Sequence, residues 1–322
     1  MPAKNERSDK APLLAFNLTE ALKVYELYTL VILTLYTALA VIFYSHIPNA
    51  RDLIFLNAVI IIGLIAIAAI TEKVYLGELF LVFRRIYIVP IVFLAYSQVQ
   101  YYIRVVNPYL YDDILIKMDY YLLGFHPTWI TGKIAFPALT EYLQGCYMLF
   151  YFMPIIHCVE LFFKGRQREL NELQTIIVFA FYASYLLYVF MPAVGPRFTL
   201  HNFATTDLDL PGLALADFFR NIVNVGGSII PGSAHPELLV NRDCMPSGHT
   251  WITLVNIILA FRNKSSFRWV ILVLGSSLIF STVYLRYHYF VDVLAGAVFA
   301  LLTLAVEPKV RAFVLRRGLA RP

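Results

Sequence analysis

Two short motifs in the last third of the chain place histidines at the starts of strongly apolar stretches. One motif is Pro246-Ser247-Gly248-His249, and the other runs from His288 to Asp292. On a helix, residues four apart lie on one face, so the Asp292 carboxylate can accept a hydrogen bond from one ring nitrogen of His288. That bond would fix the tautomer and leave the other nitrogen free to attack or to take a proton. The pair therefore indicates nucleophilic or acid–base chemistry, although an interfacial His and Asp that reach toward water would give the same spacing.

The segment around His249 is typical of an anion site at a helix start. Ser247 can cap the helix that follows, and Gly248 lets an anion approach the backbone. The first turn of such a helix offers free N–H groups and the positive end of the helix dipole. His249 lies in this turn and would face the bound anion. Alone, the four residues indicate only a capped helix, but the two motifs together favour one shared site.

A third component is Arg197, which follows Gly195 and Pro196 at the expected outer end of an apolar stretch. A guanidinium there can hold phosphate oxygens in a forked geometry. The alternative is an ordinary arginine that extends from a helix end toward water.

The elements that must position these residues are membrane spans. The chain has 322 residues, of which 60% are hydrophobic and 15% charged. Apolar stretches of about 18 residues or more predict membrane-spanning helices. We therefore expect an all-α, polytopic transmembrane helical bundle with about eight spans. The spans are expected at roughly 25–45, 52–71, 86–104, 138–162, 174–194, 248–261, 268–285 and 289–307.

The basic residues give the expected orientation. Most of the 26 Lys and Arg residues fall at the two ends and in alternate connections between the spans. This distribution predicts cytoplasmic ends and brings the 195–247 loop and the 286–292 region to the same outer face. It also explains the net charge of +5 without a nucleic-acid partner.

This order of spans predicts five segments. They are a cytoplasmic tail at 1–24, N-terminal transmembrane helices at 25–104, an interfacial amphipathic segment at 105–137, a catalytic transmembrane core at 138–307 with an irregular extracytoplasmic loop at 195–247, and a basic cytoplasmic tail at 308–322.

The order of the three components resembles the type 2 phosphatidic acid phosphatase superfamily of membrane phosphatases and phosphotransferases. The motifs of that family are Lys-(six residues)-Arg-Pro, Pro-Ser-Gly-His and Ser-Arg-(five residues)-His-(three residues)-Asp. The resemblance covers roughly 135–307, with the catalytic part in 191–296. In addition, Asp119–Trp129 and Thr140–Tyr142 look like the segment before the core in the inositol phosphorylceramide synthase-like branch.

The resemblance implies a six-helix catalytic core and a covalent phosphohistidine intermediate. His288 would be the nucleophile, oriented by Asp292, and His249 would protonate the leaving alcohol. From the residues alone, the choice of the attacking histidine stays open. The phosphate would be held by Arg197, Ser247 and Gly248. We expect no metal and no other cofactor, because the sequence shows no third ligand beside His288 and Asp292.

The chain departs from the family pattern at three positions. The lysine of the first motif would fall at Phe190, and the proline after its arginine at Phe198. In the third motif Ser281 matches, but Thr282 stands at the arginine position. If residues 282 and 286 both lie on a helix they share a face, so Arg286 is our candidate to supply the lost charge. Similar departures occur in the inositol phosphorylceramide synthase-like branch.

Several functions are compatible with these residues. The favoured one is an enzyme that acts on a lipid phosphate ester within the bilayer and passes the phosphoryl group to water or to an alcohol. A headgroup transferase and an inactive lipid-binding relative are alternatives, the latter because of Thr282. A transporter is disfavoured, because no two-fold repeat is visible. Short loops favour a bacterial inner membrane with a periplasmic site, and a luminal site in a eukaryotic endomembrane is the alternative.

Overall fold

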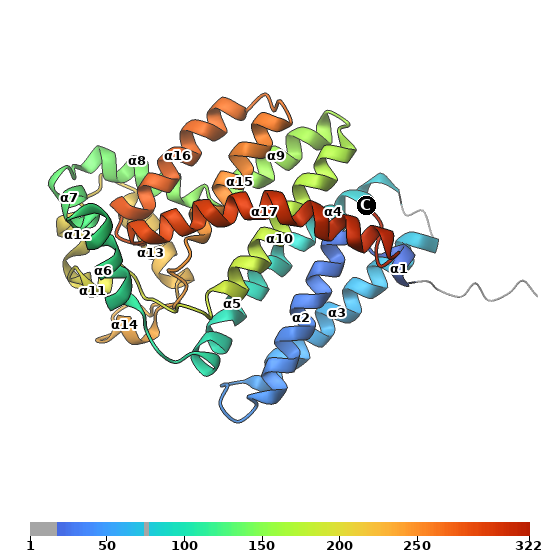
Figure 1. The fold of residues 1–322 in the computed structure, drawn as a ribbon, viewed down its shortest axis with the longest axis horizontal. Coiled ribbons are helices and arrows are strands. Elements are labelled where there is room, and N and C mark those ends of the chain that lie inside the picture. Colours follow the sequence, from blue (N-terminus) through green and yellow to red (C-terminus); the bar gives the residue numbers. More distant parts are fainter. Residues whose placement is uncertain (1–17, 74–76) are drawn as a thin grey trace, which may run out of the picture.

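The regular structure of the chain is helical, as the composition predicts. A computed structural model describes residues 18–73 and 77–322, and within them the extended structure is limited to two isolated bridges. The helices, coloured along the chain in Figure 1, are α1 (Leu18–Ala21), α2 (Val24–Ile42), α3 (Ala50–Lys73), α4 (Glu78–Ile86), α5 (Ile88–Val106), α6 (Asp112–Leu123), α7 (Pro127–Lys133), α8 (Pro137–Met148), α9 (Phe152–Phe163), α10 (Gln167–Leu187), α11 (Pro196–Thr199), η1 (Phe203–Thr205), α12 (Thr206–Asp209), α13 (Ala216–Gly226), α14 (Pro236–Leu239), α15 (Gly248–Arg262), α16 (Arg268–Tyr284) and α17 (Phe290–Arg316).

Five helical segments of the described chain are long and apolar enough to cross a membrane. They are Val24–Ile42, Ala50–Thr71, Val82–Val106, Gln167–Leu187 and Phe290–Arg316. A sixth crossing results if α8 and α9, which meet at a bend of 56°, count as one span. The protein is therefore an integral membrane protein. The number of eight spans stays a prediction, because α16 is a shorter apolar helix and α15, at 15 residues, is only about 22 Å long.

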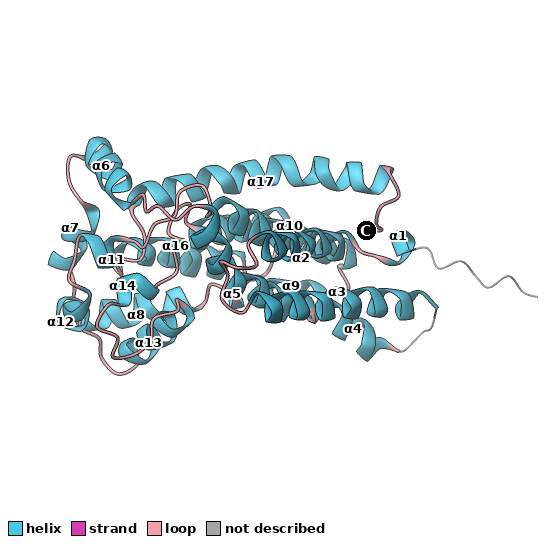
Figure 2. Ribbon diagram, turned by 90° about the horizontal axis from the view of Figure 1, so that it is seen from below, coloured by secondary structure: helices cyan, strands magenta, loops and turns pink. Residues whose placement is uncertain are grey.

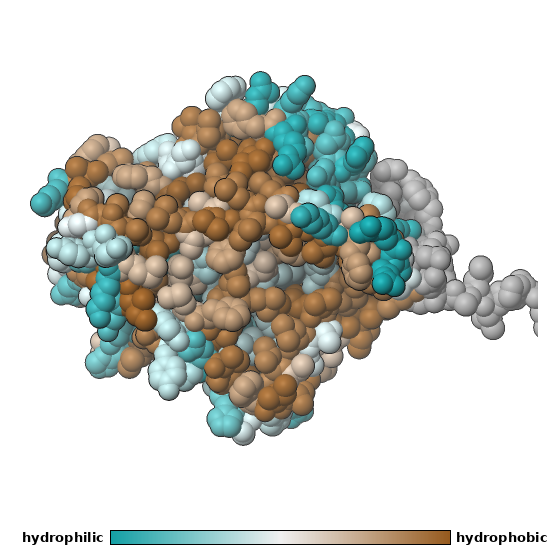
Figure 3. Space-filling view, viewed as in Figure 1, coloured by the Kyte–Doolittle hydropathy of each residue, from teal (hydrophilic) through white to brown (hydrophobic). Residues whose placement is uncertain are grey.

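The long helices form a bundle, and short helices cover one of its ends. In Figures 1 and 2, α6, α7 and α11 to α14 gather at the end opposite α1 and the C-terminus. We call these short helices and their connections the cap. Apolar residues cover the middle of the face shown in Figure 3, whereas hydrophilic residues gather toward its ends, as expected for a belt that faces lipid.

Helix α15, which begins directly after Ser247 of the first histidine motif, lies inside the bundle. It packs against α10, α16 and α17, and its first residues lie beneath the cap. Both histidine motifs are therefore at the cap end, since α15 begins there and α16 ends there.

The structure adds detail to three of the predicted segments, whose boundaries stay predictions. Residues 1–17 of the expected tail lie outside the described residues, but Leu18–Ala21 is helical and Leu22 is buried, so this part is not a free tail. At the other end, α17 continues to Arg316, well into the expected basic tail. The 195–247 loop is also less irregular than expected, because it contains five short helical segments, α11, η1 and α12 to α14.

Candidate active site

His288 lies in the connection between α16 and α17, where the main chain turns sharply. Helix α16 ends at Tyr284, and the carbonyl of Thr282 accepts hydrogen bonds from the amides of Tyr287 (2.9 Å) and His288 (3.0 Å). His288 is 4% exposed and precedes the first residue of α17. The expectation that His288 and Asp292 share a helix is therefore wrong, because the helix begins only at Phe290.

The Nδ1 atom of His288 is bound to the main chain behind it. It lies 2.8 Å from the carbonyl oxygen of Cys244 and 3.5 Å from Oδ2 of Asp292. An Nδ1–H that donates to this carbonyl leaves the Nε2 lone pair of a neutral ring free. Asp292 is thus a more distant partner of the ring than predicted. Its Oδ2 accepts from the amide of Tyr289 (2.8 Å) and from the thiol of Cys244 (2.9 Å), and so holds the segment on both sides of His288.

His249 faces the free side of His288. Its Nδ1 lies 3.5 Å from Nε2 of His288. The His249 ring stacks on Tyr147, with 4.4 Å between centroids, and lies 4.3 Å from the ring of Phe150. Aromatic packing on this scale fixes the ring plane, so the two histidines present their nitrogens to the same small volume.

Ser247 caps α15 as predicted, and its hydroxyl oxygen is occupied by the hydrogen bonds of the cap. Its Oγ accepts from the amide of Thr250 at 3.2 Å and from the hydroxyl of Thr250 at 3.1 Å, and the residue is fully buried. A Cβ at Gly248 would lie 2.2 Å from the Tyr188 hydroxyl. The packing of Tyr188 therefore requires glycine at this position, in addition to any requirement from a bound anion. The structure brings Gly248 to the wall of the cavity described below, whereas Ser247 lies behind it.

Arg197 is held at the first turn of the cap. Its amide donates to the carbonyl of Arg286 at 3.0 Å, and its guanidinium donates to Oδ1 of Asn224 at 2.8 Å. The guanidinium also lies 5.0 Å from the centre of the Tyr287 ring. Within the described residues no carboxylate forms an ion pair with Arg197, so its charge is available to an anion next to His288.

The turn that carries Arg197 depends on Gly195. The φ angle of Gly195 is +92°, and an added Cβ would lie 2.7 Å from the carbonyl oxygen of Tyr287. We expect Gly195→Ala to destabilise the protein by about 2 kcal/mol or more, because both the backbone conformation and the contact are unfavourable. Thermal unfolding in detergent, followed by tryptophan fluorescence, measures this effect. Gly145→Ala is the matched control, since Gly145 is helical with no atom within 4 Å of the added Cβ; equal unfolding midpoints for the two variants would contradict the expectation.

Arg286 does not reach the cavity between the histidines. It lies beyond the end of α16 with φ +66°, so the condition that residues 282 and 286 share a helix face is not met. Its Nη1 donates to Oδ2 of Asp209 at 2.7 Å, and this guanidinium lowers the pKa of the Asp209 carboxyl. The pair is therefore formed at neutral pH and is lost only as the pH falls through that lowered pKa. Arg286 thus joins α12 of the cap to the segment that carries His288.

This arrangement makes a prediction that separates the two roles of Arg286. If Arg286 only anchors the cap, Arg286→Ala and Asp209→Ala should reduce stability by similar amounts, and the double variant should be no worse than either. Turnover should stay within about tenfold of the wild type in all three. A loss of roughly 100-fold in Arg286→Ala alone, with Asp209→Ala unaffected, would restore Arg286 as a phosphate ligand.

Two carboxylates of the interfacial segment position the site, and sequence reasoning missed this role. Asp119 accepts hydrogen bonds from the amides of Phe290 (2.9 Å) and Val291 (2.8 Å), which are the first residues of α17. Asp112 accepts from the amides of Val194 and Gly195 at 3.1 and 2.9 Å. Helix α6 therefore holds both the segment of His288 and the turn of Arg197.

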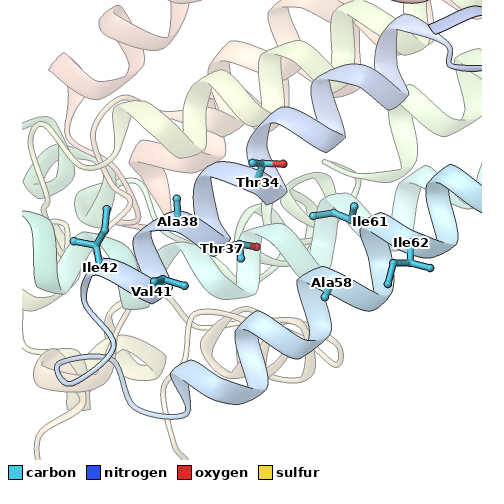
Figure 4. A pocket seen from close by; sticks show the side chains of 8 residues that line it. All are labelled: Thr34, Thr37, Ala38, Val41, Ile42, Ala58, Ile61 and Ile62. Atoms are coloured by element: carbon cyan, nitrogen blue, oxygen red, sulfur yellow. The ribbon is translucent and has the colours of Figure 1, made fainter. Parts of the chain in front are cut away.

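Arg197, Gly248, His249 and His288 line one cavity of about 670 Å³ at the junction of the bundle and the cap. Its walls are mainly aromatic, and its polar residues include Arg197, Asp243, His249 and His288. A second hollow of about 550 Å³ lies between α2 and α3 and is shown in Figure 4. Its walls are apolar apart from Thr34 and Thr37, so it offers none of the groups that the first cavity has.

A model of the PAP2 superfamily matches residues 113–306, which is more than half of the chain. The chain belongs to the PAP2 superfamily. No curated protein and no solved structure matches it. The match includes every residue of the candidate site from Arg197 to Asp292 and confirms the superfamily that the motifs predict. Membership of the PAP2 superfamily supports phosphatase or phosphotransferase activity, whereas the inositol phosphorylceramide synthase-like branch stays a prediction.

Two residues of the third PAP2 motif, His288 and Asp292, have a cysteine neighbour that the sequence did not predict. Cys244, His288 and Asp292 are buried and offer donor atoms within 4.8 Å of one another. Thiolate, imidazole and carboxylate are ligands that zinc accepts, so these are the residues that could hold a metal ion. As they stand, the Cys244 thiol donates to Asp292 (2.9 Å), which gives the three groups a role in positioning without an ion.

Proposed function

We propose that the protein is a membrane lipid-phosphate phosphatase or phosphotransferase that works through a phosphohistidine on His288. The observation that carries this proposal is the pair of ring nitrogens, Nε2 of His288 and Nδ1 of His249, 3.5 Å apart beside a cavity that also contains Arg197. A single phosphate group in that cavity can contact a nucleophile, a proton donor and a cation at once.

The reaction would proceed in two steps. In the first, Nε2 of His288 gives its lone pair to phosphorus, the bond from phosphorus to the leaving oxygen breaks, and His249 donates a proton to that oxygen. In the second, water or an acceptor alcohol loses a proton to His249 and attacks phosphorus, and the bond from phosphorus to Nε2 breaks. The His288 ring carries a positive charge in between, and the Cys244 carbonyl and Asp292 lie on its Nδ1 side to stabilise it.

The cavity suits a lipid substrate. Phe93 and Phe152 line it and are 38% and 55% exposed, so its walls continue onto the apolar surface of the bundle. That surface faces lipid chains rather than water. The acyl chains of a substrate can therefore lie against it while the phosphate reaches the polar end of the cavity. We infer that the substrate enters laterally, between α5 and α9.

We further propose that the cap lies on the extracytoplasmic side, as the Lys and Arg distribution predicts. The connections at the other end of the bundle are basic and contact each other. Arg166 donates to the carbonyl of Asn263, and Arg85 donates to Asn171 and Gln167. Such clustering supports a cytoplasmic position for that end. In a bacterial inner membrane the site would then open to the periplasm, and in a eukaryotic endomembrane to the lumen.

A second candidate is a headgroup transferase of the inositol phosphorylceramide synthase-like branch. The segments that carry this resemblance contact the start of α17 and the cap. Asp119 binds the start of α17, and Glu141 accepts from the amides of Leu213, Leu215 and Ala216 at the start of α13. These contacts connect both segments to α17 and to α13, and α13 lines the cavity.

The experiment compares phosphate release and headgroup transfer by the purified protein in detergent, without added divalent metal. The substrates are phosphatidic acid, a polyprenyl diphosphate, and ceramide with phosphatidylinositol. Free phosphate that disappears in His288→Ala would support a phosphatase, and transfer without free phosphate would support the transferase. Absence of both activities would contradict the proposal and favour a lipid-binding relative.

A further inference from the structure

Asn224, in the last turn of α13, holds the guanidinium of Arg197, and the proposed reaction gives it no role. Its Oδ1 accepts a hydrogen bond from Nη1 of Arg197 at 2.8 Å. Within the described residues this is the hydrogen bond that the guanidinium makes to the protein. A guanidinium has five N–H donors, so four of them stay available to a phosphate in the cavity.

The neutral partner of Arg197 distinguishes it from two other buried arginines at the same end of the bundle. Arg220 forms an ion pair with Asp207, and Arg286 forms one with Asp209. A buried cation is normally paired in this way, because a charge that is removed from water without a partner is costly. A neutral amide beside a buried arginine therefore indicates that the charge is kept for a ligand.

The carboxylate in the wall of the cavity does not pair with Arg197 either. Asp243 lines the same cavity, but its Oδ2 accepts a hydrogen bond from the hydroxyl of Tyr96 at 2.6 Å. The remaining contacts of the guanidinium are aromatic, since it lies 4.9 Å from the centre of the Phe198 ring and 5.0 Å from that of Tyr287. Rings and one amide oxygen thus fix the group without neutralising it.

Asn224 is itself attached firmly to the rest of the protein. Its main-chain carbonyl accepts a hydrogen bond from the amide of Ile229 at 2.9 Å. The carbonyl of Gly227 accepts one from the amide of Asn241 at 3.0 Å, which joins the end of α13 to the segment before the Pro-Ser-Gly-His motif. Glu141 binds the main-chain amides at the other end of the helix. The Asn224 side chain can therefore hold the guanidinium in place instead of following its movements.

Resting on the proposed function, we propose that Asn224 is a positioning residue that acts through Arg197. Its amide oxygen fixes the direction of the guanidinium. Because the amide is neutral, the positive charge of Arg197 stays available to the phosphate of the substrate. A carboxylate at this position would hold the guanidinium equally well but would cancel its charge.

The test measures kcat/KM and thermal unfolding of Asn224→Ala and Asn224→Asp. The substrate is whichever of phosphatidic acid, a polyprenyl diphosphate, and ceramide with phosphatidylinositol the wild type turns over. Asn224→Ala removes the hydrogen bond and should lower kcat/KM about tenfold. Asn224→Asp keeps the acceptor but should lower kcat/KM about 100-fold, because the new carboxylate neutralises Arg197 and repels the phosphate. Asn224→Asp should nevertheless unfold at the wild-type midpoint or above it, since it gives a buried cation a partner.

A second comparison shows whether Asn224 acts through Arg197. In an Arg197→Ala background, Asn224→Ala should change kcat/KM by less than about twofold, because no guanidinium is left to position. The matched control is Asn221→Asp, which adds the same charge to α13 at an exposed residue one turn earlier. Its kcat/KM should stay within about threefold of the wild type.

The outcomes separate the role of Asn224 from the proposed function. If turnover is lost in His288→Ala but Asn224→Asp is no worse than Asn224→Ala, the role of Asn224 is wrong and the proposed function stands. The same conclusion follows if Asn224→Ala costs as much without Arg197 as with it. Where Asn224→Asp unfolds below the wild type, the comparison in the Arg197→Ala background decides alone. A wild type that turns over none of the substrates contradicts both proposals.

Discussion

Replacing His288 with alanine should reduce turnover by on the order of 10⁴-fold or more, the loss typical of removing a covalent nucleophile. The reason is structural: the Cys244 carbonyl fixes Nδ1 at 2.8 Å, so Nε2 is the nitrogen directed toward the cavity. Binding of substrate should be affected much less, because Arg197 and the cavity walls stay in place. Turnover and substrate affinity are therefore measured separately, by steady-state kinetics and by binding of a non-hydrolysable lipid phosphonate.

The matched control is His235→Ala. His235 belongs to the cap, its side chain is 72% exposed, and it contacts Glu237 rather than the site. It should retain wild-type turnover. A His288→Ala variant with more than about one tenth of wild-type activity would exclude His288 as the nucleophile.

Replacing Arg197 with alanine should lower kcat/KM by roughly 10²- to 10³-fold, since a cation that stabilises charge on a transferring phosphoryl group has effects of this size. Arg197 is the lining residue with a permanent positive charge, and nothing in the described chain is placed to replace it. Arg197→Lys should recover part of the loss, because it keeps the charge but not the forked geometry.

Kinetics of both Arg197 variants are compared with those of Arg51→Ala, a change at an exposed arginine at the start of α3. Arg51→Ala should behave as wild type. If Arg197→Ala loses stability and activity in parallel with no change in kcat/KM for the folded fraction, Arg197 is a structural residue of the turn and not a phosphate ligand.

The meeting of His249, His288 and Arg197 could be predicted from the sequence. An even number of predicted membrane crossings between the motifs returns them to one side of a membrane, and the distribution of Lys and Arg identifies that side. The structure has all three at the same cavity. Helix types and approximate positions could also be predicted, because long apolar stretches allow few folds in a bilayer.

Details at the helix ends could not be predicted in the same way. His288 and Arg286 lie only two residues apart, yet one faces the cavity and the other faces Asp209. The difference arises because α16 ends at Tyr284 and Arg286 adopts a left-handed conformation. The rule that residues four apart share a helix face does not apply beyond the end of a helix. A positive φ at a non-glycine residue also cannot be predicted reliably from the sequence.

The roles of the acidic residues around the site could not be predicted for another reason. Asp112 and Asp119 act on main-chain amides more than 80 and 170 residues away along the chain. Asp243, which lines the cavity, accepts a hydrogen bond from Tyr96 of α5, 147 residues away along the chain. Such contacts follow from how the cap packs on the bundle, and in the sequence each residue is one acid among 21.

The most direct test of the central claim is to trap the covalent intermediate. Protein mixed with a lipid substrate labelled at phosphorus is quenched in alkali within milliseconds, digested, and analysed by mass spectrometry. We predict a phosphorus-bearing group on His288 that is stable in alkali, is released by acid, and is absent from His288→Ala. A label on His249 instead, or turnover in a wild type that never carries label on any histidine, would contradict the mechanism.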